Sequence, residues 1–137
     1  MWVVYALLSA VFAALTSILT KLGIANVPAS LATAIRTAVV LVMAWSIVFL
    51  TGQQQELTAL GSRNWLFLVI SGCATGFSWI FYNKALQMGD VSKVVPIDKF
   101  SVVISMALAF WVLNEGMEFK TMIGGLLITA GTLVLIL

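Results

Sequence analysis

The sequence predicts an all-α integral membrane protein, folded as a bundle of five transmembrane helices. Three observations carry this prediction. Of the 137 residues, 62% are hydrophobic and only 9% are charged, whereas a soluble domain has about a quarter of its residues charged. The apolar residues form continuous runs close to the length of about 20 residues that a helix needs to cross a bilayer. Transmembrane β-strands would instead alternate apolar and polar residues over roughly ten positions.

Five apolar runs are long enough to be membrane spans. They lie at about residues 1–20, 27–50, 65–83, 95–113 and 121–137. The polar connectors between them are too short to form a soluble domain. We therefore expect one transmembrane domain over residues 1–137.

The first run holds no charged residue. Its Ala and Ser content would suit a signal-peptide cleavage site, but no Lys or Arg precedes it, and it is long for the apolar part of a signal peptide. Four further spans follow it, so we expect this run to be a membrane helix.

The second run begins near Pro28 and contains Arg36. At a rise of about 1.5 Å per residue, Arg36 lies roughly 14 Å into the run, close to the midplane of a hydrocarbon core about 30 Å thick. An ionisable group at that depth costs roughly 2.5–3.5 kcal/mol, so it is a functional candidate. Its guanidinium suits an anionic solute or a carboxylate partner such as Asp98. Snorkelling of the side chain to the interface is the structural alternative.

The third run ends with Trp79, Tyr82 and Asn83, which share one helix face, followed by Lys84. An interfacial aromatic belt anchored by the lysine is the favoured interpretation. The alternative is a surface on which a solute stacks.

The fourth run places Pro96 and Asp98 near its start. Proline suits the first turn of a helix, and an acidic residue there is favoured by the helix dipole. On this interpretation, which geometry slightly favours, Asp98 lies at the membrane interface. Alternatively, Asp98 heads a polar stripe with Ser101 and Ser105, three and seven positions later, which suits a helix facing a cavity.

Lys99 follows Asp98 directly. Adjacent side chains on a helix point about 100° apart and do not face each other. We therefore expect Asp98 and Lys99 to find different partners, with Arg36 as a candidate for Asp98.

Small residues recur at helical spacing in two of the runs. Gly72 and Gly76 are four apart, as are Thr121, Gly125 and Thr129. Such pairs let helices approach closely in lipid. Internal packing is the favoured interpretation, and a dimer face is the alternative.

The sequence argues against an enzyme. It has no histidine, a single cysteine, no Gly-rich phosphate-binding loop and no cluster of metal ligands. We expect no cofactor and no metal. A net charge of +2 without a basic patch also argues against a nucleic-acid partner.

Five helices make a thin bundle in which to shield a polar pathway from lipid. Transporters often use two related repeats, and no internal repeat is evident in this sequence. A homodimer is therefore the economical expectation. Basic residues are nearly balanced between the two sets of connectors, with Arg63 and Lys120 opposite Lys21, Lys84 and Lys93. A single orientation and insertion in both directions, which would permit an antiparallel dimer, are weighed evenly.

Several stretches form a pattern that extends over nearly the whole chain. They are LATAIRT (31–37), SGCATGFSW (71–79), ALQMGDVSKVVPIDKFS (85–101), NE (114–115) and GGLLITAG (124–131). Together they resemble the EamA-like family of the drug/metabolite transporter superfamily, in its small five-helix bacterial form. The stretch at 85–101 is the most specific, and the glycine-rich last helix is generic for the superfamily.

The resemblance implies secondary transport of small metabolites or toxic compounds across the bacterial inner membrane. Larger relatives have ten helices in two inverted halves, so this chain looks like one half-transporter repeat that a second copy would complete. The smallest relatives, with four helices, pair as antiparallel dimers and carry a buried glutamate in the first helix, which has no counterpart here. Asp98 is the substitute candidate for proton coupling. With the resemblance, the polar cavity becomes the preferred interpretation of its stripe.

The expected partners are a small-molecule solute, the lipid bilayer and a second copy of the chain. Two other functions stay open: an auxiliary or scaffold subunit without its own pathway, and a passive channel. The predicted substrate-binding or coupling residues are Arg36, Trp79, Tyr82, Asn83, Asp98, Lys99, Ser101 and Ser105.

Overall fold

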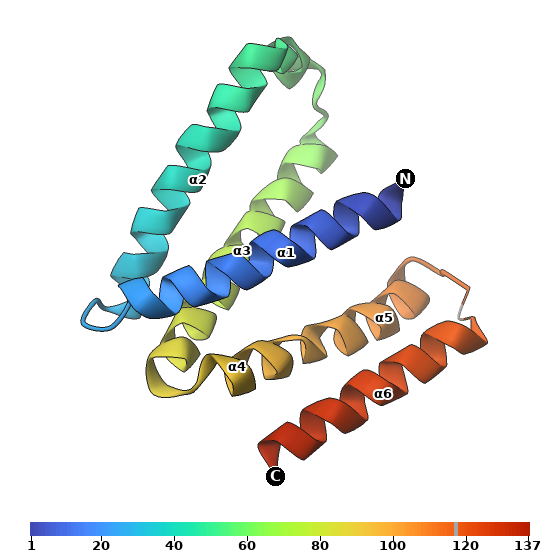
Figure 1. The fold of residues 1–137 in the computed structure, drawn as a ribbon. Coiled ribbons are helices and arrows are strands. Elements are labelled where there is room, and N and C mark those ends of the chain that lie inside the picture. Colours follow the sequence, from blue (N-terminus) through green and yellow to red (C-terminus); the bar gives the residue numbers. More distant parts are fainter. Residues whose placement is uncertain (117) are drawn as a thin grey trace. The chain divides into compact units, whose positions relative to one another are not determined.

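A computed structural model describes residues 1–116 and 118–137. Within them the structure contains helices and no strand (Figure 1). Their order is α1 (Trp2–Gly23), α2 (Ala29–Thr51), the 3₁₀-helix η1 (Gln53–Ala59), α3 (Ser62–Met88), α4 (Val91–Asp98), α5 (Phe100–Val112) and α6 (Phe119–Ile136).

Within residues 1–116 and 118–137, five helical segments are long and apolar enough to cross a membrane: α1, α2, α3, α4 with α5 as one segment, and α6. The prediction of an all-α membrane protein with five spans is therefore confirmed.

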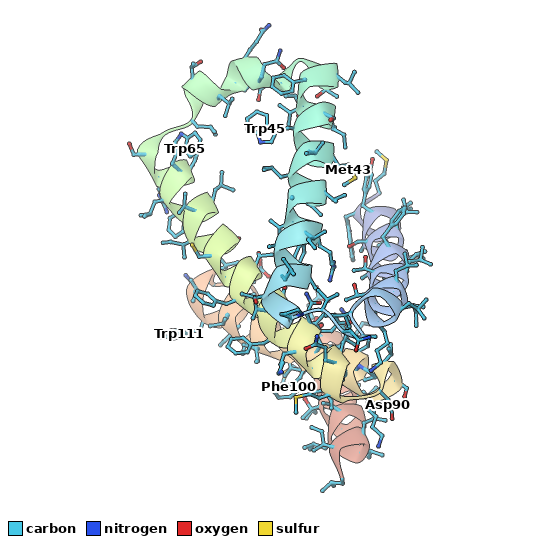
Figure 2. The ribbon with its side chains drawn as sticks, turned by 90° about the vertical axis from the view of Figure 1, so that its left-hand side faces the viewer. Met43, Trp45, Trp65, Asp90, Phe100 and Trp111 are labelled. Carbon is cyan, nitrogen blue, oxygen red and sulfur yellow. The ribbon has the colours of Figure 1, made fainter. Side chains whose placement is uncertain are left out.

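The chain buries polar side chains more readily than apolar ones. Apolar side chains are exposed along every span, among them Met43 on α2 and Trp111 on α5 (Figure 2). Among the described residues, the buried hydrophobic ones are Ile24, Ala29 and Leu86, and the buried polar ones are Ser17, Thr20, Thr33, Asn83 and Thr132. Lipid solvates apolar surface without cost, so helices in a bilayer associate through small residues and hydrogen bonds. This burial pattern is the one expected of a membrane bundle.

The chain divides into two compact units, one formed by residues 19–87 and the other by residues 1–18 with 88–137. In the unit of residues 19–87, the connector between α1 and α2 is tied to the end of α3. Lys21 Nζ donates to the Leu86 carbonyl at 2.5 Å, and Gln87 Nε2 donates to the carbonyls of Val27 and, at 3.3 Å, of Ile24. The Lys21 ammonium lies in the last turn of α1, where a cation complements the helix dipole.

Helix α3 is longer than the predicted run at residues 65–83. It begins at Ser62 and continues through Lys84 and Gln87 to Met88. From the sequence, Lys84 and Gln87 were expected to lie in the polar connector between the third and fourth runs. They lie in the helix because Gln87 is bound to the carbonyls of the α1–α2 connector and Lys84 is exposed. At the other end of this unit, α2 stops at Thr51 because Gly52 adopts a left-handed conformation with φ 73°.

The fourth span differs most from expectation. It begins at Val91, directly after Asp90, and it is divided at Lys99 into α4 and α5. Pro96 lies inside α4, so its placement in a first helical turn is wrong. The proline has no N–H to donate to the carbonyl four residues earlier, and its ring crowds that carbonyl. Asp98 therefore ends a helix instead of beginning one.

The backbone hydrogen bonds tighten at this break. The Lys99 N–H donates to the Val95 carbonyl at 3.2 Å, whereas the Val102 N–H donates to the Lys99 carbonyl, three residues back, at 2.9 Å. Beyond the break α5 ends at Val112, one residue before the end of the predicted run at residues 95–113. Helix α6 then returns alongside both α5 and α4 (Figure 1).

Candidate functional site

A group of four side chains joins α2 to α3 within the unit of residues 19–87. We call Thr33, Arg36, Trp79 and Asn83 the polar cluster. Arg36 Nη1 donates to Asn83 Oδ1 at 3.1 Å, and Asn83 Nδ2 donates to Thr33 Oγ1 at 2.7 Å. Asn83 is wholly buried, and Thr33 is 5% exposed. Two spans are thus held together by a buried hydrogen bond between Asn83 and Thr33 and by a partly buried one between Asn83 and the charged Arg36.

The direction of these hydrogen bonds follows from Thr33. Its hydroxyl donates to the Ala29 carbonyl at 2.8 Å, and a hydroxyl has only one proton to give. The Thr33 oxygen must therefore accept from Asn83. The Asn83 amide then presents its nitrogen to Thr33 and its oxygen to Arg36. The asparagine can adopt only one of its two amide orientations, which fixes the acceptor that positions the guanidinium.

Trp79 supports the guanidinium from a second side. The Arg36 Cζ atom lies 5.1 Å from the centroid of the Trp79 ring, within the range of a cation–π contact. Trp79 precedes Asn83 by one helical turn, so both project from the same face of α3. Arg36 is therefore contacted by Asn83 at Nη1 and by the Trp79 ring at Cζ.

The polar cluster contains the charged Arg36 side chain and no carboxylate to pair with it. Residues 19–87 contain four basic side chains and one acidic side chain, Glu56, which lies in η1. In the part of the chain that the structure describes, the one side-chain ion pair joins Lys99 to Asp98, in the other unit. The sequence-based alternative of a structural pair between Arg36 and Asp98 stays a prediction, because these residues belong to different units.

Tyr82 precedes Asn83 in α3 and is partly buried. The sequence grouped it with Trp79 and Asn83. In the structure the hydrogen bonds that organise the polar cluster come from Asn83, and the ring contact to Arg36 comes from Trp79.

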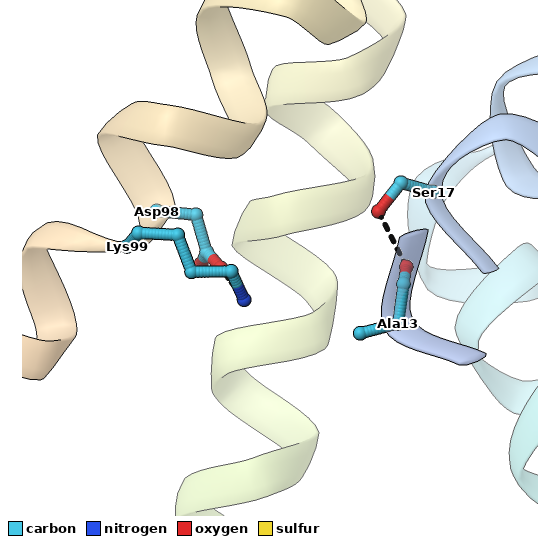
Figure 3. A network of polar contacts seen from close by, with 4 residues as sticks. All are labelled: Ala13, Ser17, Asp98 and Lys99. Carbon is cyan, nitrogen blue, oxygen red and sulfur yellow. Dashed lines mark hydrogen bonds and ion pairs between the residues drawn. The ribbon is translucent and has the colours of Figure 1, made fainter. Parts of the chain in front are cut away.

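Asp98 and Lys99 contact each other, contrary to expectation. Lys99 Nζ lies 3.7 Å from Asp98 Oδ2, and the side chains are 53% and 37% exposed (Figure 3). The spacing rule for a continuous helix fails here because the helix is interrupted at Lys99 and the lysine stem is long enough to fold back. An exposed pair of this kind contributes little to stability.

A second polar contact lies within α1. There, Ser17 Oγ donates to the Ala13 carbonyl at 2.9 Å (Figure 3).

A groove of about 560 Å³ lies between α5 and α6. Ser105 lines it together with Met106, Glu115, Gly125 and Thr129, whereas Asp98 and Ser101 are not among its lining residues. Ser101 is exposed on α5. The structure thus brings Ser105 to a cavity and leaves the other two residues of the predicted stripe outside it.

Sequence reasoning missed three residues that organise the unit of residues 19–87. Thr33 orients Asn83, and Lys21 and Gln87 tie the α1–α2 connector to α3. The available signal for Thr33 was its position three residues before Arg36, on the same helix face. Lys21 and Gln87 gave no pattern beyond being polar residues near the ends of apolar runs.

Comparison with known proteins agrees with this architecture. The family model described as "EamA-like transporter family" matches residues 1–137. A protein of Sinorhizobium sp, described as "Uncharacterized transporter in cobO 3'region", is 43% identical over 134 residues, which cover 98% of this chain and 95% of the relative. No solved structure matches the chain. The resemblance found in the sequence is confirmed, and the protein is a multi-pass membrane transporter that belongs to the EamA-like transporter family.

Proposed function

We propose that the protein is a homodimeric secondary transporter of small metabolites or toxic compounds in the bacterial inner membrane. The observation that carries the proposal is Arg36, a charged side chain in a membrane span. It is positioned by a partly buried hydrogen bond to the buried Asn83 and has no carboxylate partner in its own unit. A charge in such a place is costly, so its retention favours a role in moving a solute.

The transport is proposed to be independent of nucleotide hydrolysis. The sequence contains no phosphate-binding Gly-rich loop, and its connectors are too short for a nucleotide-binding domain. The energy would then come from a gradient of the solute or of a coupled ion. Asp98 is the proposed coupling residue because no other carboxylate lies within a predicted span.

The proposed homodimer is supported by a surface of α3 that the chain leaves uncovered. Gly72 is exposed, and a Cβ atom built at Gly72 or at Gly76 would have no atom within 4 Å. Glycines at this spacing let two helices approach closely in lipid. A second copy of α3 is the proposed occupant, in parallel or antiparallel orientation, so that two single-domain chains form one transporter.

The eight predicted site residues divide into two proposed roles. Residues of α2 and α3 contact the solute: Arg36, Trp79, Tyr82 and Asn83. Residues near the break between α4 and α5 couple or gate its movement: Asp98, Lys99, Ser101 and Ser105.

The proposal is tested by transport assays on purified protein reconstituted in lipid vesicles. Arg36→Ala and Asp98→Asn are each expected to abolish solute uptake while the protein still inserts and dimerises. Arg63→Gln is the matched control, because Arg63 is also an arginine of α3's unit and lies over Phe67, 5.8 Å from the ring centroid, outside the polar cluster. Wild-type uptake by both Arg36→Ala and Asp98→Asn would refute the site assignment.

A further inference from the structure

We propose that the polar cluster is an anion site, which takes a small solute through a carboxylate or phosphate group. The inference rests on the proposed transport function and names the class of its substrate. Three features support it: the hydrogen bond of Arg36, the acid–base composition of its unit and the asparagine at position 83.

The guanidinium of Arg36 has donors to spare. An arginine carries five N–H donors, and the hydrogen bond that the structure gives to Arg36 uses Nη1 alone. The acceptor is the amide oxygen of Asn83, which is neutral. The positive charge is therefore positioned without being neutralised.

Within residues 19–87, the surroundings of Arg36 add no negative charge. Glu56, the one acidic residue in 19–87, lies in η1, and the cluster is formed by α2 and α3. The ammonium of Lys21 is bound to a backbone carbonyl, and Lys84, which follows Asn83, adds a further cation. An anion entering this unit would offset a charge whose placement in a span costs roughly 2.5–3.5 kcal/mol.

The contacts also orient the free part of the guanidinium. The Arg36 Cζ atom lies over the Trp79 ring, and Nη1 donates to Asn83, so the guanidinium is held at two points and its remaining N–H groups keep a fixed direction. A planar fork of parallel N–H groups matches the two oxygens of a carboxylate or phosphate. The site is thus preorganised for a bidentate anion, and a neutral or cationic solute would leave these donors unused.

The residue at position 83 decides whether Arg36 can bind an anion or is neutralised by an internal ion pair. An aspartate there would also accept from Arg36, although it could not donate to Thr33, and it would cancel the guanidinium charge. The observed amide holds the arginine and leaves the charge available. Asn83→Asp is therefore expected to convert an anion site into an internal ion pair while the two helices stay joined.

The first experiment needs no variant. Thermal unfolding of the full-length protein in lipid-free nonionic detergent is followed with benzoate against benzamide and with succinate against succinamide, in chloride at constant ionic strength. Ligands that bind the folded state raise its unfolding midpoint. The carboxylates are expected to raise the midpoint in a concentration-dependent way and the matched amides to leave it unchanged. Equal effects of carboxylate and amide would overturn the proposal.

A second arm separates the two sources of an anionic group. Inorganic phosphate and phosphatidylglycerol are added to the same detergent sample in parallel. A response to the soluble anions supports a solute site. A response to phosphatidylglycerol alone would mean that Arg36 holds a lipid headgroup, and it would overturn the solute assignment.

The third arm uses variants with a matched control. Asn83→Asp and Arg36→Gln are each expected to weaken the carboxylate response at least about tenfold in apparent affinity, which corresponds to about 1.4 kcal/mol or more. Arg63→Gln, which removes the same charge outside the cluster, is expected to keep the wild-type response. An unchanged response in Asn83→Asp and Arg36→Gln would refute the proposal. If Asn83→Asp does not fold, the carboxylate–amide comparison on the wild-type protein still decides the question.

Failure of this inference can be told apart from failure of the transport proposal. Uptake of cationic or neutral solutes by wild-type vesicles, without any carboxylate response, would refute the anion site and leave the transporter standing. Specific carboxylate binding without flux of labelled benzoate or succinate into vesicles would support the site and count against transport of these solutes.

Discussion

Thr33 governs the position of Arg36 although it carries no charge and does not touch it directly. Its single proton is committed to the Ala29 carbonyl, so its oxygen is free to accept from Asn83. The chain of donors and acceptors then reaches Arg36 through the Asn83 oxygen. The position of the charged Arg36 side chain thus depends on the Thr33 hydroxyl, which acts through Asn83.

Thr33→Val tests this dependence, because valine keeps the shape and removes the hydroxyl. The buried Asn83 amide loses its acceptor. We expect the free energy of unfolding to fall by about 1 kcal/mol, since a hydrogen bond between helices in a bilayer contributes about 0.6–2 kcal/mol. Titration with a denaturing detergent, followed by circular dichroism, measures the change. Thr33→Ser, which retains the hydroxyl, should stay close to the wild-type stability. A loss of stability in Thr33→Ser without a loss in Thr33→Val would show that the methyl group matters and the hydroxyl does not.

At this scale the sequence indicated Arg36, Trp79 and Asn83 of the polar cluster and could not assemble them. Arg36 was recognised by its depth in a span, and Trp79 and Asn83 by their shared helix face. Their meeting requires α2 and α3 to pack with the correct rotation, although Arg36 and Asn83 are 47 positions apart. No local pattern specifies that rotation. Thr33 was overlooked because threonine in an apolar helix commonly bonds only to its own backbone.

The sequence predicted the number of membrane spans, because the bilayer sets their length. It did not predict that the fourth span is divided into α4 and α5. Hydropathy averaged over a span does not reveal a one-residue break, so residues 95–113 were treated as a single helix. Pro96 was the visible signal of the break. It was consistent with a first helical turn as well, and only the structure shows that α4 already begins at Val91.

The α5–α6 pair shows how a single glycine is used for packing. Gly125 is buried, and a Cβ atom added there would lie 3.4 Å from Met106 Sδ. Its neighbour Gly124 would meet nothing within 4 Å. Of the two interpretations of small residues in α6, internal packing therefore describes Gly125.

Gly125→Leu should separate α5 from α6, whereas Gly124→Leu provides a matched control of equal size. Overfilling a packed contact costs about 1–3 kcal/mol, so the unfolding midpoint of Gly125→Leu is expected to fall clearly below that of wild type. Gly124→Leu should change the free energy of unfolding by no more than about 0.5 kcal/mol. The same loss in both variants would show that general helix flexibility, and not the contact with Met106, is responsible.

Over the whole molecule, the distribution of small and polar residues is reversed relative to a soluble protein. Large apolar side chains face outward along every span, and most of the buried side chains among the described residues are threonine, serine and asparagine. Composition predicted this reversal, because a chain with 9% charged residues has to be solvated by lipid. It could not predict which apolar surface is covered by lipid and which by another protein chain.

Gly72 and Gly76 are the place where that distinction can be measured. Replacing both with leucine is expected to weaken the proposed dimer, because two α3 helices could no longer approach closely. The double variant should run mainly as a monomer after chemical crosslinking in vesicles. Gly124→Leu, on another helix, should crosslink as the wild type does. A double variant that still dimerises fully would place the interface elsewhere.

A dimer that acts as one transporter should also be sensitive to a single defective copy. Wild-type chain and Arg36→Ala chain, expressed together and reconstituted at equal amounts, form mixed dimers. If both protomers must be competent, uptake falls to about a quarter of the all-wild-type value, whereas independent protomers would retain about half. Adding Gly72→Leu and Gly76→Leu to the defective copy should prevent it from pairing with the wild type. Uptake should then return to about half, because the intact chains pair among themselves.

Two other outcomes would contradict this prediction. Uptake of about half in both mixtures would mean that each chain transports alone. Uptake of about a quarter in both mixtures would mean that the dimer forms without this face of α3.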